Sequence, residues 1–345
     1  MMPKPKPIAM DLYHGCGGLT TGLKQAGFRV IASIDIDPVS AETYHMNHPE
    51  VRIYTEDIRK IDAHQFAEEQ GFKVGELDLL AGCPPCQGFS SLRTFNGALV
   101  IDDPRNDLLF EFLRFVKVLK PKAVMLENVP GLARDKRFVV FLEQMEQMGY
   151  IGEKSILNAE DYSVPQRRRR LLYLAGKGFA IPFAKKARRK RNVRHAIGDL
   201  PKPGNSGDPL HDIKEKRSPT VLERIAMIPP NGGSRASLPD HLQLRCHKKT
   251  NGFKDVYGRM AWDDVAPTIT SGCSNPSKGR FLHPEQNRAI TLREAALLQG
   301  FSRDYKFPTD KSKSEIALMI GNALPPPFVK AHALSIKHAL ITNDI

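Results

Sequence analysis

The chain has 345 residues, of which 41% are hydrophobic, and its basic residues exceed its acidic ones by 51 − 38 = +13. This length suits one large domain and a smaller one, and the composition excludes a chain too polar to form a core. No apolar run approaches the roughly 18–20 residues that span a bilayer, and the start, "MMPKPKPIAMDL", lacks the apolar segment of a secretion signal. We therefore expect a cytoplasmic protein with no membrane partner, and its charge favours a polyanion, nucleic acid first.

The first half of the chain alternates short apolar runs with amphipathic segments. Strands are predicted at 7–12, 28–37, 76–82 and 122–129, with helices before Gly27 and over 39–48, 106–119 and 138–150. This alternation predicts an α/β domain with a largely parallel sheet.

The character of the chain changes near residue 177. A strongly basic run, "KGFAIPFAKKARRKRNVRH", is followed over 200–285 by prolines, glycines and polar residues that interrupt every apolar run. We interpret this region as a smaller, loop-rich second domain. Helical patterns return at 291–301 and at 327–340, where Pro327 marks a helix start.

The first predicted turn has the features of a cofactor site. Gly15, Gly17 and Gly18 allow a ligand to approach the backbone without Cβ atoms in the way. Asp35 ends the next strand about 20 residues on, where an acid can bind ribose hydroxyls. The spacing is not that of G-x-G-x-x-G, so a nucleoside cofactor without pyrophosphate is the favoured ligand, and an ordinary glycine-rich turn is the alternative. Asp57 is a further polar candidate for this ligand.

Cys83 and Cys86 have C-x-x-C spacing, directly after a predicted strand. Three hypotheses follow: a redox couple, half of a metal site, or one nucleophile beside a second cysteine. The chain has five cysteines, an odd number, which disfavours a disulfide framework. For a nucleophile, Glu127 ends a neighbouring strand and the run "QRRRR" at 166–170 could stabilise a thiolate. The residues alone leave these alternatives open.

Taken together, the motifs resemble those of the cytosine-C5 DNA methyltransferases, a family that uses S-adenosylmethionine. The resemblance covers nearly the whole chain, and the motifs occur in the family's order. The matching segments are "DLYHGCGG" (11–18), "TEDI" (55–58), "GCPPCQGFS" (82–90), "LENVPG" (126–131), "DYSVPQRRRR" (161–170), "TLREAALLQGF" (291–301) and "IGNALPPP" (320–327).

The resemblance implies a Rossmann-like S-adenosylmethionine-dependent methyltransferase domain with a mostly parallel sheet, built from residues 1–176 and 288–345. Residues 177–287 would form a smaller, loop-rich target-recognition domain. The last motif would fold back beside the first glycine turn.

The resemblance also assigns the site residues. Cys86 would be the nucleophile and Cys83 a bystander, Glu127 would contact the target base, and Arg168 would orient that base and favour the thiolate. The remaining catalytic candidates are Asn128, Gln87 and Arg170. The cofactor-binding candidates are Asp11, Tyr13, Gly15, Gly17, Gly18, Leu19, Asp35, Ile36, Asp57, Ile58, Pro84, Asn322 and Ala323; no metal is required.

The chain departs from the family pattern around the cofactor. Asp35 stands where glutamate is usual, and Tyr13, His14 and Cys16 replace the commoner phenylalanine and smaller or aliphatic residues. These differences concern the fine geometry of the cofactor site, whereas each position expected to do chemistry carries the expected residue.

The implied partner is double-stranded DNA, with the target base flipped out of the helix. The segment 87–104 would close over the DNA, with Ser90 and Arg93 near phosphates. Candidate base-reading residues are Arg235, Arg245, Lys248 and Lys249.

Two alternatives differ in substrate or in class: a cytosine-C5 methyltransferase acting on tRNA, and a non-catalytic DNA-binding regulator. The leading hypothesis is a monomeric enzyme of bacterial or phage type, located in the bacterial cytosol or nucleoid. A restriction endonuclease that acts on the same DNA site is a possible partner.

Overall fold

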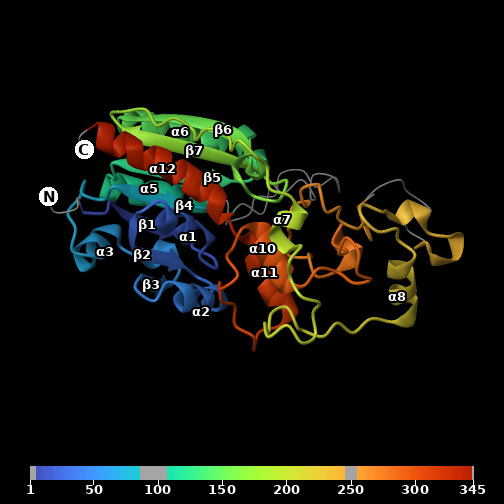
Figure 1. The fold of residues 1–345 in the computed structure, drawn as a ribbon. Helices are drawn as coiled ribbons and strands as arrows, with labels where there is room; N and C mark the ends of the chain where they lie inside the picture. Colours follow the sequence, from blue (N-terminus) through green and yellow to red (C-terminus); the bar gives the residue numbers. More distant parts are fainter. Residues whose placement is uncertain (1–4, 86–106, 245–254, 344–345) are drawn as a thin grey trace. The chain divides into compact units, whose positions relative to one another are not determined.

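The computed structural model describes residues 5–85, 107–244 and 255–343 (Figure 1). The chain divides into two compact units. The first unit comprises Met1–Tyr162, Arg169–Lys186 and Leu324–Ile345, and the second comprises Ser163–Arg168 and Ala187–Ala323.

The first unit is built on one seven-stranded sheet, in the order β3-β2-β1-β4-β5-β7-β6. Strands β1 to β5 pair in parallel, whereas β7 runs antiparallel to both β5 and β6. The predicted α/β fold with a mostly parallel sheet is therefore confirmed. The strands are β1 Ile8–Leu12, β2 Arg29–Asp35, β3 Arg52–Thr55, β4 Leu79–Gly82, β5 Ala123–Asn128, β6 Tyr150–Asn158 and β7 Arg169–Lys177.

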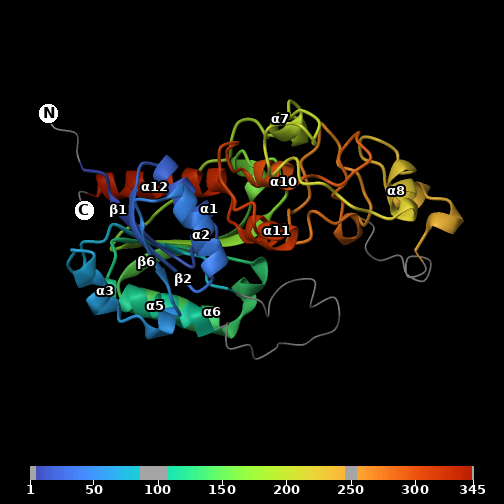
Figure 2. The same cartoon turned by 90° about the horizontal axis from the view of Figure 1, so that it is seen from below.

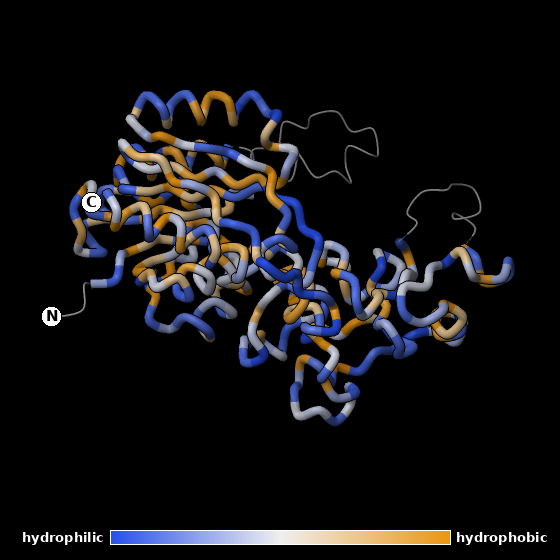
Figure 3. Tube along the Cα trace, turned by 45° about the horizontal axis from the view of Figure 1, so that its top comes forward, coloured by the Kyte–Doolittle hydropathy of each residue, from blue (hydrophilic) through white to orange (hydrophobic). Residues whose placement is uncertain are grey.

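Helices cover both faces of this sheet (Figure 2). On one face lie α1 (Gly18–Gln25), α2 (Pro38–Asn47) and α12 (Pro326–Thr342), and on the other lie α3 (Ala63–Glu69), α5 (Leu108–Leu119) and α6 (Lys136–Gln147). Apolar residues concentrate in the strands between the two layers (Figure 3). Short 3-10 segments at Ile58–Lys60, Pro130–Arg134 and Ala159–Tyr162 complete this unit.

The C-terminal helix α12 packs tightly against α1. A Cβ placed on Gly22 would lie only 2.4 Å from the Cβ of Val329 and 2.7 Å from the carbonyl oxygen of Pro326. Glycine at position 22 therefore permits the close approach of the two helices. Because of this contact, the first unit contains both the beginning and the end of the chain.

Three strands, β3, β6 and β7, are absent from the sequence-based prediction. Strand β3 is only four residues long, and the edge strand β6 is mostly exposed and carries charged residues. Neither therefore has the apolar run that predicts a buried strand. Strand β7 begins inside the arginine run, so its polar start conceals the buried segment that follows.

The second unit is loop-rich, as expected. Its helices are α7 (Val193–Ile197), α8 (Pro219–Ala226), α10 (Leu292–Gln299) and α11 (Lys313–Asn322), with 3-10 segments at Arg235–Ser237, Asp240–Leu242 and Pro276–Lys278. Among its described residues, strand pairing is limited to isolated bridges.

A buried arginine organises the core of the second unit. Arg259 is 1% exposed, and its guanidinium donates to the carbonyl oxygens of Ile228 (2.9 Å), Ile225 (2.9 Å) and His283 (3.1 Å). Buried carbonyls need such donors, and without a strand ladder they must take them from side chains. Arg259 therefore supplies hydrogen-bond donors to buried carbonyls of the second unit, as strand pairing does in the first unit.

The division into units differs from the sequence-based boundaries at three places, the first being residues 177–186, which belong to the first unit. Residues 163–168 and 288–323 belong to the second unit, because α10 packs against α7 and α11. Gln166 joins them: its side chain donates to the carbonyl oxygen of Leu298 (3.1 Å) and to Oε1 of Gln299 (2.7 Å).

Over the described ranges, every helix is too short or too polar to span a bilayer.

Candidate functional site

The glycine-rich turn between β1 and α1 has open space beside the backbone of Gly15. Tyr13, Gly15 and Gly17 have positive φ angles of 65°, 49° and 91°. A Cβ built on Gly15 would meet no atom within 4 Å. The turn thus presents open backbone, which suits the close approach of a ligand.

Asp35, at the end of β2, supports this turn directly. Its Oδ2 accepts a hydrogen bond from the Gly15 amide (2.9 Å), and its Oδ1 accepts one from the Asp37 amide (2.9 Å). The side chain of the neighbouring Ile36 is 64% exposed, although it is apolar. The structure therefore brings a carboxylate and an exposed apolar surface together beside the open backbone.

Beneath the turn lies a buried polar network around Asp11. Oδ2 of Asp11 accepts a hydrogen bond from the Thr20 hydroxyl (2.7 Å), which also lies 2.7 Å from the Tyr44 hydroxyl. Complete burial raises the pKa of Asp11 to about 8. The ring of His14 lies against Tyr44, with centroids 4.3 Å apart, and burial lowers the pKa of His14. Asp11 therefore supports the turn from within, largely protonated at neutral pH.

The other cofactor candidates of the first unit differ in accessibility. Asp57 caps the 3-10 segment that begins at Ile58, and hydrogen bonds from the Arg59 side chain, the shortest at 2.6 Å, lower the pKa of Asp57. Ile58 and Leu19 are buried. Tyr13 donates its hydroxyl to the carbonyl oxygen of Leu108 (2.7 Å). Gly18 is the first residue of α1.

The described catalytic candidates of the first unit, Glu127, Asn128 and Arg170, lie beside the carboxyl ends of β4 and β5. Glu127 is 8% exposed, and its Oε1 lies 2.9 Å from Nε of Arg170 on β7. Asn128 donates its side-chain amide to the carbonyl oxygen of Pro84 (2.9 Å), which joins the two strand ends. In a parallel sheet this edge is where ligands bind.

Cys83 belongs to the same cluster. Its side chain lies beside Glu127 across the β4–β5 pair, and desolvation together with the Glu127 charge raises the pKa of Cys83 well above its usual range. A thiol with a raised pKa is a poor nucleophile and a poor redox partner. The redox hypothesis for Cys83 is correspondingly disfavoured.

Arg168, the residue expected to orient the base, is hydrogen-bonded to main-chain carbonyls of the second unit. It is 2% exposed, and it donates to the carbonyl oxygens of Ile269 (3.0 Å) and Gly321 (2.8 Å) within the second unit. A Cβ on Gly321 would lie 2.4 Å from the Thr270 carbonyl carbon and the Ser271 amide nitrogen, so this segment is closely packed.

Of the remaining predicted residues, some lie in the described part of the second unit and the others lie outside the described residues. Asn322 ends α11 and is exposed, whereas Ala323 is buried and its carbonyl oxygen accepts a hydrogen bond from Gln299. Arg235 begins a 3-10 segment of the second unit. Outside the described residues lie Cys86, Gln87, Ser90, Arg93, Arg245, Lys248 and Lys249.

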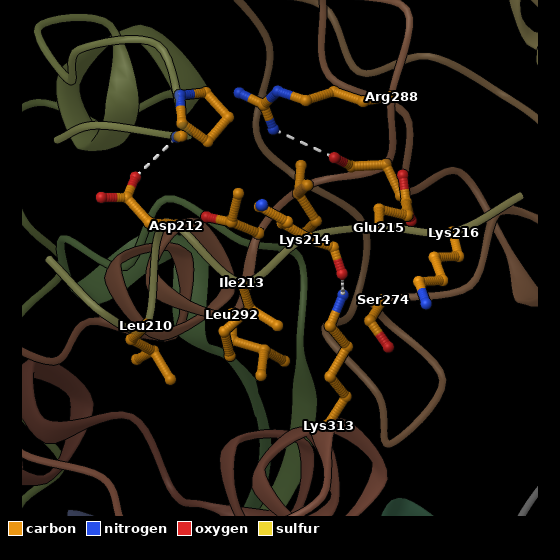
Figure 4. Close-up of a pocket in the computed structure, with 15 residues that line it drawn as sticks. Leu210, Asp212, Ile213, Lys214, Glu215, Lys216, Ser274, Arg288, Leu292 and Lys313 are labelled. Atoms are coloured by element: carbon orange, nitrogen blue, oxygen red, sulfur yellow. Dashed lines mark hydrogen bonds between the residues drawn. The ribbon is translucent and has the colours of Figure 1, made fainter. Parts of the chain in front are cut away.

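Two features of the site were not anticipated from the sequence. The first feature is the proximity of Cys83 to Glu127, which depends on the pairing of β4 with β5. A sequence signal for it was present, because each residue lies at or just after the end of a strand. The second unit also contains a cavity of about 390 Å³ (Figure 4). Lys313 reaches into it and donates to the carbonyl oxygen of Lys214 (2.8 Å), and the start of the motif "TLREAALLQGF", Thr291 and Leu292, contributes to its lining.

Comparison with known proteins identifies the family. The profile of the C-5 cytosine-specific DNA methylases matches residues 9–338. The Type II methylase M.HgiDII of Herpetosiphon aurantiacus is 38% identical, covering 96% of this chain and 95% of that protein. The Type II methyltransferase M1.HphI of Haemophilus parahaemolyticus is 33% identical, covering 94% and 85%.

Solved structures share the fold. A prophage-encoded E. coli protein, described as a DNA modification methyltransferase, superposes with a TM-score of 0.74 at 23% identity, covering 97% of this chain and all of the other. The extent of the profile match and the identity to the Type II enzymes together establish that this chain belongs to the C-5 cytosine-specific DNA methylase family.

Proposed function

We propose that this enzyme transfers a methyl group from S-adenosylmethionine to C5 of a flipped-out cytosine in double-stranded DNA, through a covalent bond between Cys86 and C6. The observation that carries this proposal is the Glu127–Arg170 pair at the carboxyl ends of the central strands, beside the glycine turn of the same sheet. The proposed donor site and the proposed base-binding carboxyl therefore lie on the same sheet.

The open turn fits a nucleoside-bearing methyl donor. The open space beside Gly15 would accept the body of the ligand, Asp35 would bind the ribose hydroxyls, and the exposed Ile36 side chain would contact a face of the adenine ring. Asp57 remains the proposed adenine contact, with its carboxylate shared with Arg59. We keep Asn322 and Ala323 as proposed contacts on the strength of their motif. S-adenosylmethionine, when bound, supplies an electrophilic methyl group.

The nucleophile activates the ring in this mechanism. Cytosine C5 is a weak nucleophile, and addition of the Cys86 thiolate to C6 places electron density on C5. Once C5 carries the methyl group, loss of the C5 proton and expulsion of the Cys86 sulfur restore the aromatic ring and the thiolate. The raised pKa of Cys83 supports Cys86 as the reacting cysteine of the pair.

Glu127 and Arg170 are the proposed partners of the base. The Glu127 carboxyl would bind the N3 side of the ring and offset the charge that develops there during attack. We assign to Arg170 the orienting role first expected of Arg168, because Arg170 pairs with Glu127 at 2.9 Å whereas Arg168 holds two main-chain carbonyls. Asn128 would hold the Pro84 backbone at the base of the motif.

Double-stranded DNA is the proposed substrate, and the second unit would read its sequence. The net charge of +13 and the basic run at 185–191 suit phosphate contacts. Extrusion of the base costs a few kcal/mol, which such contacts must offset.

The test is transfer of labelled methyl groups from S-adenosylmethionine to duplex DNA and, in parallel, to tRNA. We expect incorporation into duplex DNA, mapped to cytosines by bisulfite sequencing, and its loss in Cys86→Ser. Labelling of tRNA but not of DNA would favour the RNA alternative, and undiminished transfer by Cys86→Ser would refute the nucleophile.

A further inference from the structure

Cys83 and Glu127 are placed side by side by the pairing of β4 with β5. Gly82 and Leu126 are partners at the end of this parallel pair, and Cys83 and Glu127 each follow directly. Side chains alternate between the faces of a sheet. Leu126 belongs to the core packed by α5, and a Cβ on Gly82 would meet Phe112 of α5 at 2.9 Å. Cys83 and Glu127 therefore point together to the opposite face.

The main chain of Cys83 is fixed from the other side. Its amide donates to the carbonyl oxygen of Leu12 (3.2 Å), the last residue of β1. The following carbonyl, that of Pro84, accepts the Asn128 side chain at 2.9 Å. The backbone of Cys83 is consequently held on both sides, and its side chain is directed to the face of the sheet that carries Glu127.

Glu127 thus has a donor on each neighbouring strand. Nε of Arg170 approaches from β7 at 2.9 Å, and the thiol of Cys83 approaches from the end of β4. Two donors from opposite sides fix both the position and the plane of a carboxyl group. Burial and the Glu127 charge raise the pKa of the Cys83 thiol, so it retains the proton that it donates.

We infer that Cys83 is a positioning residue for the methyl-transfer reaction: its thiol donates a hydrogen bond to the Glu127 carboxylate and, with Arg170, holds that carboxyl in the orientation that binds the cytosine ring. The inference rests on the proposed function. It gives the first cysteine of "CPPC" a task of its own, distinct from nucleophilic attack and from redox exchange.

The kinetic test compares Cys83→Ala with Cys83→Ser. Alanine removes the donor, and because a thiol is a weak donor we expect kcat to fall by about 3- to 10-fold. Serine keeps a donor, and kcat should stay within about twofold of wild type. KM for S-adenosylmethionine should change by less than about twofold in both variants, because Cys83 acts on the carboxyl that binds the base.

The matched control is Cys273→Ala, which removes a buried thiol of the second unit. It should leave kcat unchanged. Equal thermal unfolding midpoints for Cys83→Ala and Cys83→Ser would show that their difference in kcat is not one of folding.

A spectroscopic test is independent of activity. The Raman S–H stretching band of Cys83 is isolated by subtracting the spectrum of Cys83→Ser from that of the wild type, and again in a Glu127→Gln background. Replacement of the carboxylate by a neutral amide weakens the acceptor, so the band should move to higher frequency in that background.

The outcomes separate the two proposals. Wild-type kinetics in Cys83→Ala, or a Cys83 band that Glu127→Gln leaves in place, would overturn the positioning role while methyl transfer stands. A wild-type protein that methylates no nucleic acid, with a band that still moves, would sink the proposed function but leave the Cys83–Glu127 hydrogen bond intact.

Discussion

Two arginines of one run hold different partners in the two units. Arg170, in the first unit, pairs with the carboxylate of Glu127, whereas Arg168, in the second, donates to main-chain carbonyls. Arg167, which precedes Arg168, and Arg169, which lies between Arg168 and Arg170, are exposed. In the sheet, strand pairing satisfies the backbone and leaves side chains available for chemistry. The described residues of the second unit form few strand bridges. There, the side chains of arginines such as Arg259 donate hydrogen bonds to main-chain carbonyls instead.

The sharpest test of this difference replaces each arginine by methionine. Arg170→Met should lower kcat by about 100-fold, because it leaves the Glu127 carboxylate without its charged partner. Arg168→Met should instead destabilise the second unit by about 3 kcal/mol, because two buried carbonyls lose charged donors. Methyl transfer measures the first effect, and fluorescence of Trp262, the one tryptophan and a residue of the second unit, follows the second during urea unfolding.

Arg169→Met is the matched control, since its side chain is exposed on the same strand. It should change kcat by less than about threefold and stability by less than about 0.5 kcal/mol. If Arg168→Met lost activity while its unfolding curve matched that of the wild type, the result would support Arg168, and not Arg170, as the residue that orients the base.

The cofactor turn offers a second comparison, between Asp35 and Asp37. Asp35→Ala should raise the Kd for S-adenosylmethionine by about 10- to 100-fold, because the carboxylate holds the Gly15 amide and is the proposed ribose partner. Isothermal titration calorimetry measures this.

Asp37 caps α2 through the amides of Val39 and Ser40. Asp37→Ala should therefore cost about 1 kcal/mol of stability with little change in cofactor affinity. Equal losses of affinity in the two variants would mean that the turn responds to general loosening and not to the Asp35 contact.

The stability of the first unit should also depend on pH. Burial raises the pKa of Asp11 to about 8, far above its value in the unfolded chain. The folded state then binds a proton that the unfolded state has released, so stability falls as pH rises towards 8. Below about 6.5, His48 opposes this, because burial lowers its pKa to about 4 and makes protonation of the unfolded chain favourable.

Between pH 6.5 and 8 the wild type should therefore lose about 1–2 kcal/mol of stability, measured by calorimetry at several pH values. Asp11→Asn, which cannot ionise, should be flat across this window. A wild-type curve as flat as that of Asp11→Asn would show that Asp11 is charged in the folded protein.

The sequence predicted the parts of the site that depend on strand ends. Gly15, Asp35 and Glu127 follow apolar runs of the central sheet, and carboxyl ends of parallel strands converge. The roles of Arg168 and Arg170 could not be separated in this way, because residues two apart share a strand face. The pairing of Glu127 with Leu172 of β7 supports the proposed role of Arg170, because it makes Arg170 the diagonal neighbour of Glu127 on the same face. That register depends on β7, which the sequence-based prediction lacked.

The most direct test of the account is covalent capture of the enzyme by DNA that contains 5-fluorocytosine. Fluorine at C5 cannot leave as a cation, so the bond between Cys86 and C6 persists after methyl transfer. On duplexes that carry this base at the methylated site, S-adenosylmethionine should produce a complex that resists denaturing electrophoresis, with the DNA attached to Cys86. Active methylation of normal duplexes without such a complex would contradict the covalent mechanism.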